Sequence, residues 1–296
     1  MKSILLFGGS GFLSKHILEF GLKKNYEFIS ITRGLKKTLT HKNLTKISID
    51  RDDIIDKSFI KNHKFDLIID CNFKSEKHSK QIVKLAEKSK GIIAISSDYV
   101  YSPFFRKLKQ DEDKATYTDF DSMGYNKRKA EIYLESNQEK DLYRYIIFRP
   151  PHIYGPGSFP GTIPNHGRDR DLIEKINNNI PLKLIHNGLG LIQPIYVLDL
   201  VKIIFYFIEN NLLDNQIFNC PGPSLMTHKD YYLAFAKLLN KQLVIDDTFI
   251  TEIDNVNPFP YNHRYYDNKK IQKFLKNFEY TEFYEGIGQW LQELKG

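Results

Sequence analysis

The chain has 296 residues, of which 41% are hydrophobic and 27% charged, and its formal net charge is +7. This composition is typical of a soluble globular protein with one large or two small domains. The lysines and arginines are scattered, so we expect a solvated basic surface or a pull on anionic ligands, and nucleic acid is an unlikely partner. No segment reaches the roughly 18 apolar residues that a membrane span needs.

Cys71 and Cys220 lie in apolar, strand-like segments without a CxxC partner, so neither a disulfide framework nor a zinc site is expected. The histidines at positions 78, 152, 166 and 186 show no metal-ligand spacing, and we interpret them as solvated or structural. Unpaired cysteines fit a reducing compartment, and we expect the protein in the cytoplasm. The short apolar run at residues 4–7 leads straight into a glycine turn, which favours a buried strand over a signal peptide.

Short apolar runs alternate with helical patterns through the first half of the chain. The runs predict strands at residues 4–7, 28–31, 46–49, 67–69, 92–95 and 144–148. The patterns between them predict helices at 13–22, 54–62, 76–89 and 125–136. Apolar strands separated by helices indicate a parallel sheet covered on both faces. Right-handed crossovers then give a doubly wound α/β domain.

The pattern changes after Arg149. Residues 150–167 are rich in proline and glycine and predict a long loop, which is more often functional than idle. Further helices are predicted at 171–178, 229–239 and 284–294, and a strand end running into an apolar helix is predicted over 195–208. The acidic run at 111–113 predicts an exposed loop.

The glycine turn Gly8-Gly9-Ser10-Gly11 comes directly after the first strand and opens a helix. In this setting Gly8 permits the tight turn, and Gly11 lets the backbone approach a pyrophosphate. The helix N-terminus adds N–H groups and a partial positive charge. Strand, turn and helix together predict a dinucleotide site, with Ser14 at the position where a third glycine is common.

The second strand ends at Thr32-Arg33-Gly34. Sites that prefer NAD usually place an acid there, which accepts hydrogen bonds from the ribose hydroxyls. An acid would repel the 2′-phosphate of NADP, whereas the guanidinium of Arg33 can pair with it. The sequence therefore favours NADP, with NAD as the alternative.

Groups suited to proton transfer follow in the second half of the predicted sheet. Tyr125 and Lys129 lie one helical turn apart on the same helix face. An ammonium so close favours the ionised phenol, so Tyr125 can act as acid or base in hydride transfer at a carbonyl. Ser97 follows the fifth predicted strand, at the sheet edge where ligands of open α/β sheets react.

The ordered set of motifs resembles the extended short-chain dehydrogenase/reductase superfamily, which includes nucleotide-sugar epimerases, dehydratases and ketoreductases. The resemblance covers nearly the whole chain. It rests on Gly8-x-x-Gly11, Ser97-x-x-Val100-Tyr101, Tyr125-x-x-x-Lys129, Arg149-Pro150-Pro151, Tyr196-Val197-Leu198-Asp199 and Phe218-Asn219-Cys220. It implies a Rossmann α/β domain at 1–155 with a return segment near 192–220, and a smaller, mainly substrate-binding α/β domain at 156–296.

By this resemblance the catalytic set is Ser97, Tyr125 and Lys129. Tyr125 would exchange the proton, Lys129 would hold the nicotinamide ribose and Ser97 would orient the carbonyl. The cofactor contacts implied are Gly8, Ser10, Gly11, Phe12, Leu13, Arg33, Asp50, Arg51, Cys71, Tyr125, Lys129 and Pro150, with Asp50 and Arg51 beside the adenine. The substrate contacts implied are Asp98, Tyr99, His152, Arg168 and Arg264. A homodimer is also implied.

Three departures from the family pattern bear on function. Ser97-Asp98-Tyr99 stands where dehydratases have Thr-Asp-Glu, so the glutamate base for water elimination is missing, and the segment is similar to that of keto-sugar reductases. Ile192 stands where many members have an arginine that grips a diphosphate, and Arg168, Arg170 or Arg264 can substitute. Asp70-Cys71-Asn72 replaces small alanines and resembles the subgroup that contains chloroplast stem-loop RNA-binding proteins.

The sequence therefore favours an NADP(H)-dependent reductase of a nucleotide-linked keto-sugar. Within the same fold, the alternative is a nucleotide-sugar epimerase that holds NAD tightly. A third hypothesis is a dinucleotide scaffold or RNA-binding protein without redox chemistry, which the pI of about 9.0 motivates. The intact Ser97, Tyr125 and Lys129 set argues against this third hypothesis, because a binding module has no use for a matched acid and base.

Overall fold

The computed structural model describes residues 2–36, 39–53, 63–86, 89, 91–137, 142–162, 168–246 and 263–295. The chain divides into two compact units. The first comprises Met1–Val100, Tyr117–Arg149 and Leu200–Phe218, and the second comprises Tyr101–Thr116, Pro150–Asp199 and Asn219–Gly296. The boundary between the two units falls after Arg149. The boundary at residue 155 between the two functional domains stays a prediction.

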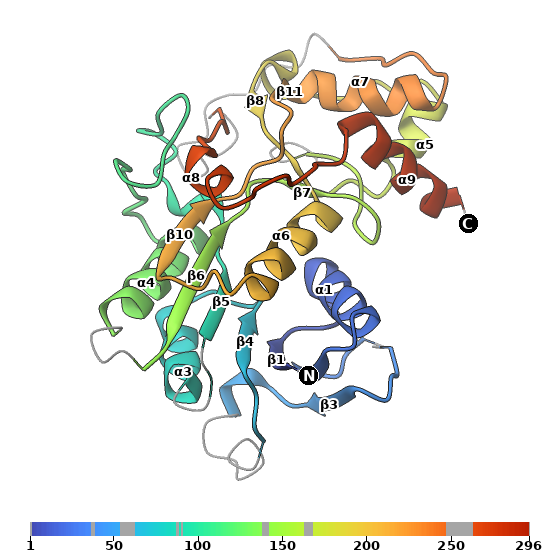
Figure 1. The fold of residues 1–296 in the computed structure, drawn as a ribbon. Coiled ribbons are helices and arrows are strands. Elements are labelled where there is room, and N and C mark those ends of the chain that lie inside the picture. The colour runs from blue at the N-terminus through green and yellow to red at the C-terminus, as the bar shows by residue number, and fades with distance from the viewer. Residues whose placement is uncertain are drawn as a thin grey trace. The chain divides into compact units, whose positions relative to one another are not determined.

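A seven-stranded sheet forms the centre of the first unit (Figure 1). Its strands are β1 (Ser3–Phe7), β2 (Glu27–Thr32), β3 (Leu44–Ser48), β4 (Leu67–Asp70), β5 (Gly91–Ile95), β6 (Arg144–Arg149) and β10 (Gln216–Asn219). They follow the order β10-β6-β5-β4-β1-β2-β3. Every pairing from β3 through to β6 is parallel. Since the chain moves outward from β1 in both directions, the sheet has a switch point between β1 and β4, where ligands of such folds bind.

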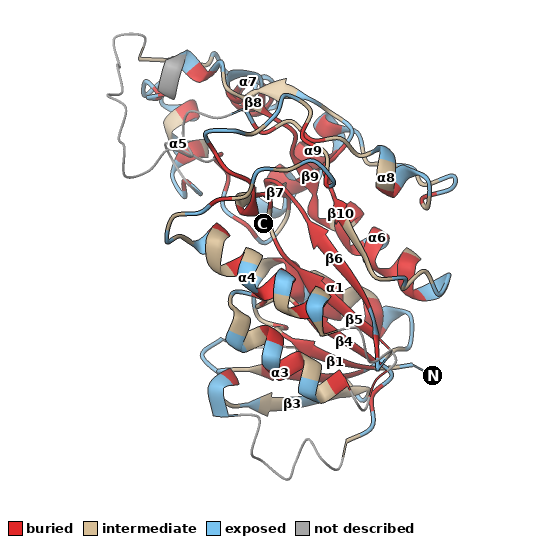
Figure 2. Ribbon diagram, turned by 90° about the vertical axis from the view of Figure 1, so that its left-hand side faces the viewer, coloured by how far each residue is buried: buried red, intermediate tan, exposed pale blue. Residues whose placement is uncertain are grey.

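Helices cover both faces of this sheet. Figures 1 and 2 show α3 (Glu76–Ala86) and α4 (Met123–Ser136) on one face, and α1 (Phe12–Lys23) and α6 (Val197–Glu209) on the other. Burial on both faces explains why the central strands are apolar along their length, as their continuous red colour in Figure 2 shows. The edge strand β3 is largely exposed and correspondingly polar.

The doubly wound α/β fold predicted from the sequence is confirmed, and the differences lie at element ends. β4 extends to Asp70, one residue past the predicted strand. α3 spans Glu76–Ala86 in the described residues, and Ser89, the predicted end, is not helical. α4 begins two residues earlier than predicted because the Ser122 Oγ accepts a hydrogen bond from the Tyr125 N–H at 3.1 Å and caps the helix. The helix predicted at 54–62 lies outside the described residues.

The second unit has an aromatic core and short strand pairs. β7 (Ile153–Tyr154) pairs in parallel with β9 (Ile195–Tyr196), and β8 (Leu191–Ile192) pairs antiparallel with β11 (Met226–Thr227). The helices are α5 (Leu172–Asn177), α7 (His228–Leu238), α8 (Lys269–Gln272) and α9 (Phe283–Lys295). Trp290 on α9 is fully buried, and its ring lies edge-on to Phe235 of α7 at 5.5 Å between centroids. The predicted helices near 171–178, 229–239 and 284–294 therefore match α5, α7 and α9.

The acidic run at 111–113 is not the fully exposed loop that the sequence predicted. Glu112 is buried, and its carboxylate accepts a hydrogen bond from the Asn219 backbone N–H at 2.7 Å. Within the described residues, no group of three or more His, Cys, Asp or Glu side chains is arranged to hold a metal ion. In that same part of the chain, every helix is too short or too polar to cross a bilayer.

Candidate active site

The turn after β1 has a backbone that only glycine adopts readily. Gly8 and Gly9 have φ values of +138° and +127°. A Cβ on Gly8 would lie 2.7 Å from the Cβ of Ser14, and one on Gly9 would collide with the Ser30 Oγ. The Ser30 hydroxyl donates a hydrogen bond to the Gly8 carbonyl at 2.6 Å. The turn is thus packed tightly against β2 and α1, and it forms a backbone cradle that fits a pyrophosphate.

Ser14 takes over a capping role at the position where a third glycine is common. Its Oγ accepts a hydrogen bond from the Gly11 N–H at 3.2 Å and lies 3.3 Å from the Gly11 carbonyl. The first turn of α1 carries no acidic residue. The positive end of the helix dipole is therefore not offset by a carboxylate of its own helix, which suits an anionic ligand.

A cavity of about 460 Å³ lies at the carboxyl ends of β1 to β4, beside this turn. It is lined by Phe7, Gly8, Ser10, Gly11, Ser14, Ile31, Thr32, Arg33, Leu35, Lys36, Ile49, Asp50, Arg51, Asp52, Cys71, Asn72, Lys74 and His78. Seven of the expected cofactor contacts are thus brought together: Gly8, Ser10, Gly11, Arg33, Asp50, Arg51 and Cys71. Phe12, Leu13, Tyr125, Lys129 and Pro150 are not among the lining residues, and Pro150 belongs to the second unit.

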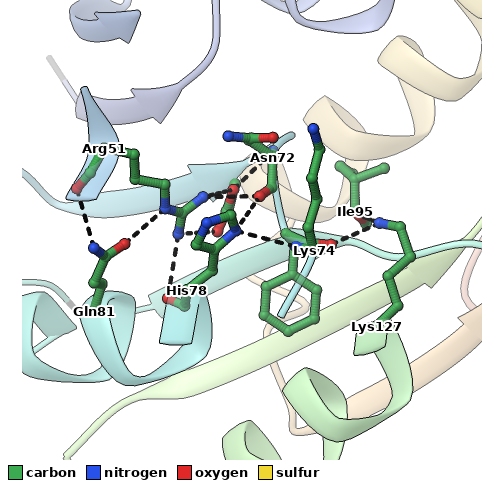
Figure 3. Close-up of polar contacts among 9 residues, drawn as sticks. Arg51, Asn72, Lys74, His78, Gln81, Ile95 and Lys127 are labelled. Carbon is green, nitrogen blue, oxygen red and sulfur yellow. Dashed lines mark hydrogen bonds and ion pairs between the residues drawn. The ribbon is translucent and has the colours of Figure 1, made fainter. Parts of the chain in front are cut away.

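The guanidinium of Arg51 donates all of its hydrogen bonds within the protein (Figure 3). Its guanidinium donates to both oxygens of the buried Asp70 carboxylate, at 2.8 and 2.6 Å. The remaining N–H groups donate to the Gln81 side chain at 2.8 Å and to the carbonyls of Asn72 and His78 at 3.0 and 3.2 Å. All five donors of the group are used. The guanidinium of Arg51 therefore shapes the cavity wall, Asp50 is exposed beside it, and the expected contact of Arg51 with adenine stays a prediction.

Two further residues of the cavity wall are His78, predicted to be solvated or structural, and Cys71, predicted to contact the cofactor. His78 is half-buried there, and its Nδ1 lies 2.7 Å from the Asn72 carbonyl. Burial and the nearby Arg51 lower the pKa of His78. Burial raises the pKa of the Cys71 thiol, with Asp70 adding to the effect, so Cys71 offers an uncharged group at neutral pH.

The catalytic candidates are gathered in the first unit by close backbone packing. Ser97 precedes the short helical turn Asp98–Val100, and its hydroxyl donates to the Asp98 carboxylate at 3.1 Å. A Cβ on Gly124, in the first turn of α4, would collide with the Tyr99 carbonyl oxygen. Glycine at this position therefore lets α4 lie directly against the turn that carries Ser97. On α4, the Lys129 Nζ lies 4.2 Å from the centre of the Tyr125 ring.

Lys127, which lies between Tyr125 and Lys129, is a further site residue that the sequence motifs did not predict. Its side chain is buried, and its Nζ donates to the carbonyls of Phe73 at 2.6 Å and Ile95 at 3.2 Å (Figure 3). Helical periodicity is the feature of the sequence that could have predicted the burial of Lys127. Gly124, Lys127, Glu131 and Leu134 recur at spacings of three and four residues and form the buried stripe of α4. Glu131 on this stripe pairs with the buried Arg149 at 2.7 Å.

Three of the expected substrate residues lie together in the second unit. His152 is buried, and burial together with Arg168 and Arg264 lowers its pKa well below the usual range. Burial and Arg264 likewise lower the pKa of His228 to about 3. These imidazoles are uncharged at neutral pH and lie among arginines, so the cluster favours an anion. The backbone of Arg264 is bridged to Ile192, the position where the family arginine is missing. Asp98 and Tyr99 belong to the first unit.

A doubly wound sheet with a glycine cradle at its switch point, and with Ser, Tyr and Lys at its carboxyl edge, defines a Rossmann-type protein of the dinucleotide-binding class. The model of the NAD dependent epimerase/dehydratase family matches residues 4–220, and the chain belongs to this family. The family's members are enzymes. The predicted membership of the extended short-chain dehydrogenase/reductase superfamily is thereby confirmed.

Solved structures share this fold at low sequence identity. A UDP-glucose 4-epimerase from Thermotoga maritima is 17% identical over 99% of this chain and 98% of that chain, with a TM-score of 0.77. A UDP-N-acetylglucosamine 4-epimerase from Methanobrevibacter ruminantium is 18% identical over 99% and 98%, with a TM-score of 0.80. A UDP-glucuronic acid 4-epimerase from Bacillus cereus is 16% identical over 99% and 96%, with a TM-score of 0.78. No curated protein shows significant sequence similarity.

The family model supports NAD-dependent epimerase or dehydratase chemistry at the level of the family. The epimerase alternative fits the comparisons better than the ketoreductase that the sequence favoured, and they do not confirm NADP as the main cofactor. The expected homodimer and cytoplasmic location stay predictions.

Gly124 can be tested by adding the missing methyl group. We expect Gly124→Ala to destabilise the protein by about 1–3 kcal/mol, because the new Cβ forces α4 away from Tyr99. The matched control is Gly288→Ala in α9, where an added Cβ meets nothing within 4 Å. Alanine is the better helix former, so this control should be neutral or stabilising by up to about 1 kcal/mol. Urea unfolding measures both, and equal effects of the two substitutions would contradict the close packing.

Lys127 predicts a pH dependence of stability. Burial lowers its pKa from about 10.5 to about 8, against the attraction of Asp70 and Glu131. Between these values the unfolded chain holds a proton that the folded protein has lost, so stability rises with pH in this window. We expect the free energy of unfolding of the wild type, relative to Lys127→Met, to rise by about 2 kcal/mol from pH 7 to pH 10. A pH-independent difference in urea unfolding would show that the ammonium is not buried.

Proposed function

We propose that the protein is a nucleotide-sugar epimerase that uses a bound nicotinamide dinucleotide. The observation that carries the proposal is the close packing of α4 against the Ser97 turn through Gly124 and Tyr99, in the unit that also holds the glycine cradle. The family to which the chain belongs supports it. Tyr99 stands where dehydratases carry their glutamate base, which argues against water elimination.

The residues of this chain supply the proton chemistry. A bound nicotinamide supplies hydride acceptance and hydride return at one sugar carbon. Tyr125 accepts the proton of the sugar hydroxyl as hydride leaves the carbon, and it gives the proton back when the configuration has inverted. The Lys129 ammonium, 4.2 Å from the centre of the Tyr125 ring, stabilises negative charge that develops on the Tyr125 oxygen, and the Ser97 hydroxyl donates a hydrogen bond to the sugar oxygen. No net reductant is consumed, which distinguishes this reaction from a reduction.

The arginine cluster of the second unit supports a nucleotide diphosphate as the part of the substrate that is held. Arg264 is bridged to Ile192 and so replaces, from another segment, the arginine that this position lacks. His152 and His228 stay uncharged beside Arg264, so the positive charge of this cluster is carried by its arginines. A diphosphate is the anion that matches such a cluster in a nucleotide sugar.

The keto-sugar reductase remains the second candidate, and one observation favours it. Arg33 and Lys36 line the cavity at the end of β2 and are exposed there, where a 2′-phosphate would lie. The nearest acids are turned to other partners, since the Asp50 carboxylate accepts the Asp52 N–H at 3.0 Å and Asp52 pairs with Lys77 at 2.8 Å. This charge pattern supports NADP, the cofactor that reductases of this kind tend to use.

Replacing the catalytic phenol tests the enzyme proposals. Tyr125→Phe should lower turnover by about 10²–10⁴-fold and leave dinucleotide binding within about twofold, because only the proton donor is lost. Tyr133→Phe, on the same helix, is the control and should keep full activity. The assay follows interconversion of UDP-, dTDP- and GDP-sugars and, separately, NADPH consumption with keto-sugars. Dinucleotide binding without turnover in either assay would reject both enzymes and favour the scaffold or RNA-binding hypothesis.

Arg33 decides the cofactor preference if it faces the 2′-phosphate. We expect Arg33→Ser to weaken NADP binding by about 10–100-fold and NAD binding by no more than about twofold, because only NADP carries the paired charge. Lys46→Ser on the exposed strand β3, outside the cavity, controls for a general change in charge. Isothermal titration with both dinucleotides measures the difference. Equal weakening of NAD and NADP would show that Arg33 does not read the phosphate.

A further inference from the structure

The buried ammonium of Lys127 joins three segments of the first unit (Figure 3). The lysine itself is on α4, two residues from Tyr125 and two from Lys129. One of its acceptors is the Phe73 carbonyl, between the cavity-lining residues Asn72 and Lys74. The other is the carbonyl of Ile95, the last residue of β5 and two residues before Ser97. One side chain thus connects the cofactor cavity, the catalytic turn and the catalytic helix.

Stability alone does not explain a lysine at this place. The charged groups that face Lys127 are Asp70, Glu131 and Lys74, with the Cys71 thiol beside them. Asp70 is already paired with Arg51, and Glu131 with Arg149, so among the described residues no unpaired carboxylate is left to form a salt bridge with Lys127. Its hydrogen bonds go to two backbone carbonyls. An apolar residue would avoid the desolvation of a buried charge, so the lysine costs stability where it stands.

The segment that Lys127 holds on the cofactor side is itself fixed from the other direction. The Asn72 carbonyl accepts hydrogen bonds from Arg51 at 3.0 Å, and the Asn72 N–H donates to Asp70 at 2.8 Å. The backbone at Asn72 and Phe73 is therefore held between Arg51 on the side of the cavity and Lys127 on the side of α4. Movement of this segment would be transmitted to α4 through the ammonium.

We propose that Lys127 is a positioning residue that sets the distance between the dinucleotide and the Ser97–Tyr125 pair by tying α4 to the Phe73 and Ile95 carbonyls. It touches neither sugar nor nicotinamide, and it acts through the residues that do. The proposal rests on the proposed function for its catalytic consequence, and its effect on dinucleotide binding stands without it.

The first experiment replaces the ammonium by an apolar chain of similar length. Lys127→Met should keep the melting temperature within a few degrees or raise it, since a buried charge is removed. It should weaken dinucleotide binding by about 3–10-fold and lower kcat by at least about tenfold, with the KM for the sugar nucleotide unchanged. Lys84→Met, an exposed lysine on α3, is the control and should match the wild type. Unchanged dinucleotide affinity and kcat in Lys127→Met would overturn the proposal.

The second experiment separates positioning from a general structural effect. If Lys127 acts by placing the Ser97 hydroxyl, the loss of kcat in Lys127→Met/Ser97→Ala should be well below the product of the two single losses. A loss equal to that product would overturn the proposal, because it would mean that Lys127 acts independently of Ser97. If the wild type turns over no sugar nucleotide, the proposed function fails. Dinucleotide binding to Lys127→Met then still decides whether Lys127 orders the cofactor side.

Discussion

The carboxylate of Asp70, fully buried at the end of β4, is the charge on which the functional edge of the first unit depends. It is paired with Arg51 through two hydrogen bonds, and it accepts a third from the Asn72 N–H. A carboxylate at this depth is tolerated only because its charge and its hydrogen-bonding capacity are both satisfied. Because Asp70 lies at the switch point between β1 and β4, this hydrogen-bonded network lies beside the glycine cradle.

From Asp70 the hydrogen-bonded network extends in two directions. Toward the cavity, Arg51 stacks on the Phe7 ring at 4.3 Å and holds the carbonyls of Asn72 and His78. Toward α4, the same β4–α3 segment accepts the Lys127 ammonium at Phe73. The family pattern that the sequence resembles would place small alanines here. In this chain a polar network holds the segment between β4 and α3 in place. It fixes the orientation of the segment as well as its distance from its neighbours, because hydrogen bonds are directional.

Local features of the fold and site could be predicted because they depend on residues close in sequence. The buried strands β1, β2, β4, β5 and β6 could be predicted from their apolar runs, and the glycine turn follows from backbone sterics at two positions. The Tyr125 and Lys129 pair is likewise a matter of helical spacing. The role of Arg51 could not be predicted, since its partners lie 19 to 30 residues away, on other elements. Taken alone, it looks like an exposed cation beside an adenine site.

The amino-acid sequence by itself determined the class of fold, the glycine cradle and the types of group that carry the chemistry. Period-two and period-3.6 patterns and glycine torsions are set by neighbours along the chain. Only the tertiary structure decided which charged side chains line the cavity and which are paired or hydrogen-bonded inside the protein. Arg33 lines the cavity, and Arg51 is paired with Asp70. The Lys127 ammonium donates a hydrogen bond to the carbonyl of Ile95, two residues before Ser97. The physical reason is that a charged side chain is buried only where the fold supplies an ion-pair or hydrogen-bond partner, and otherwise it stays hydrated at the surface. Those partners come from segments that are distant in sequence.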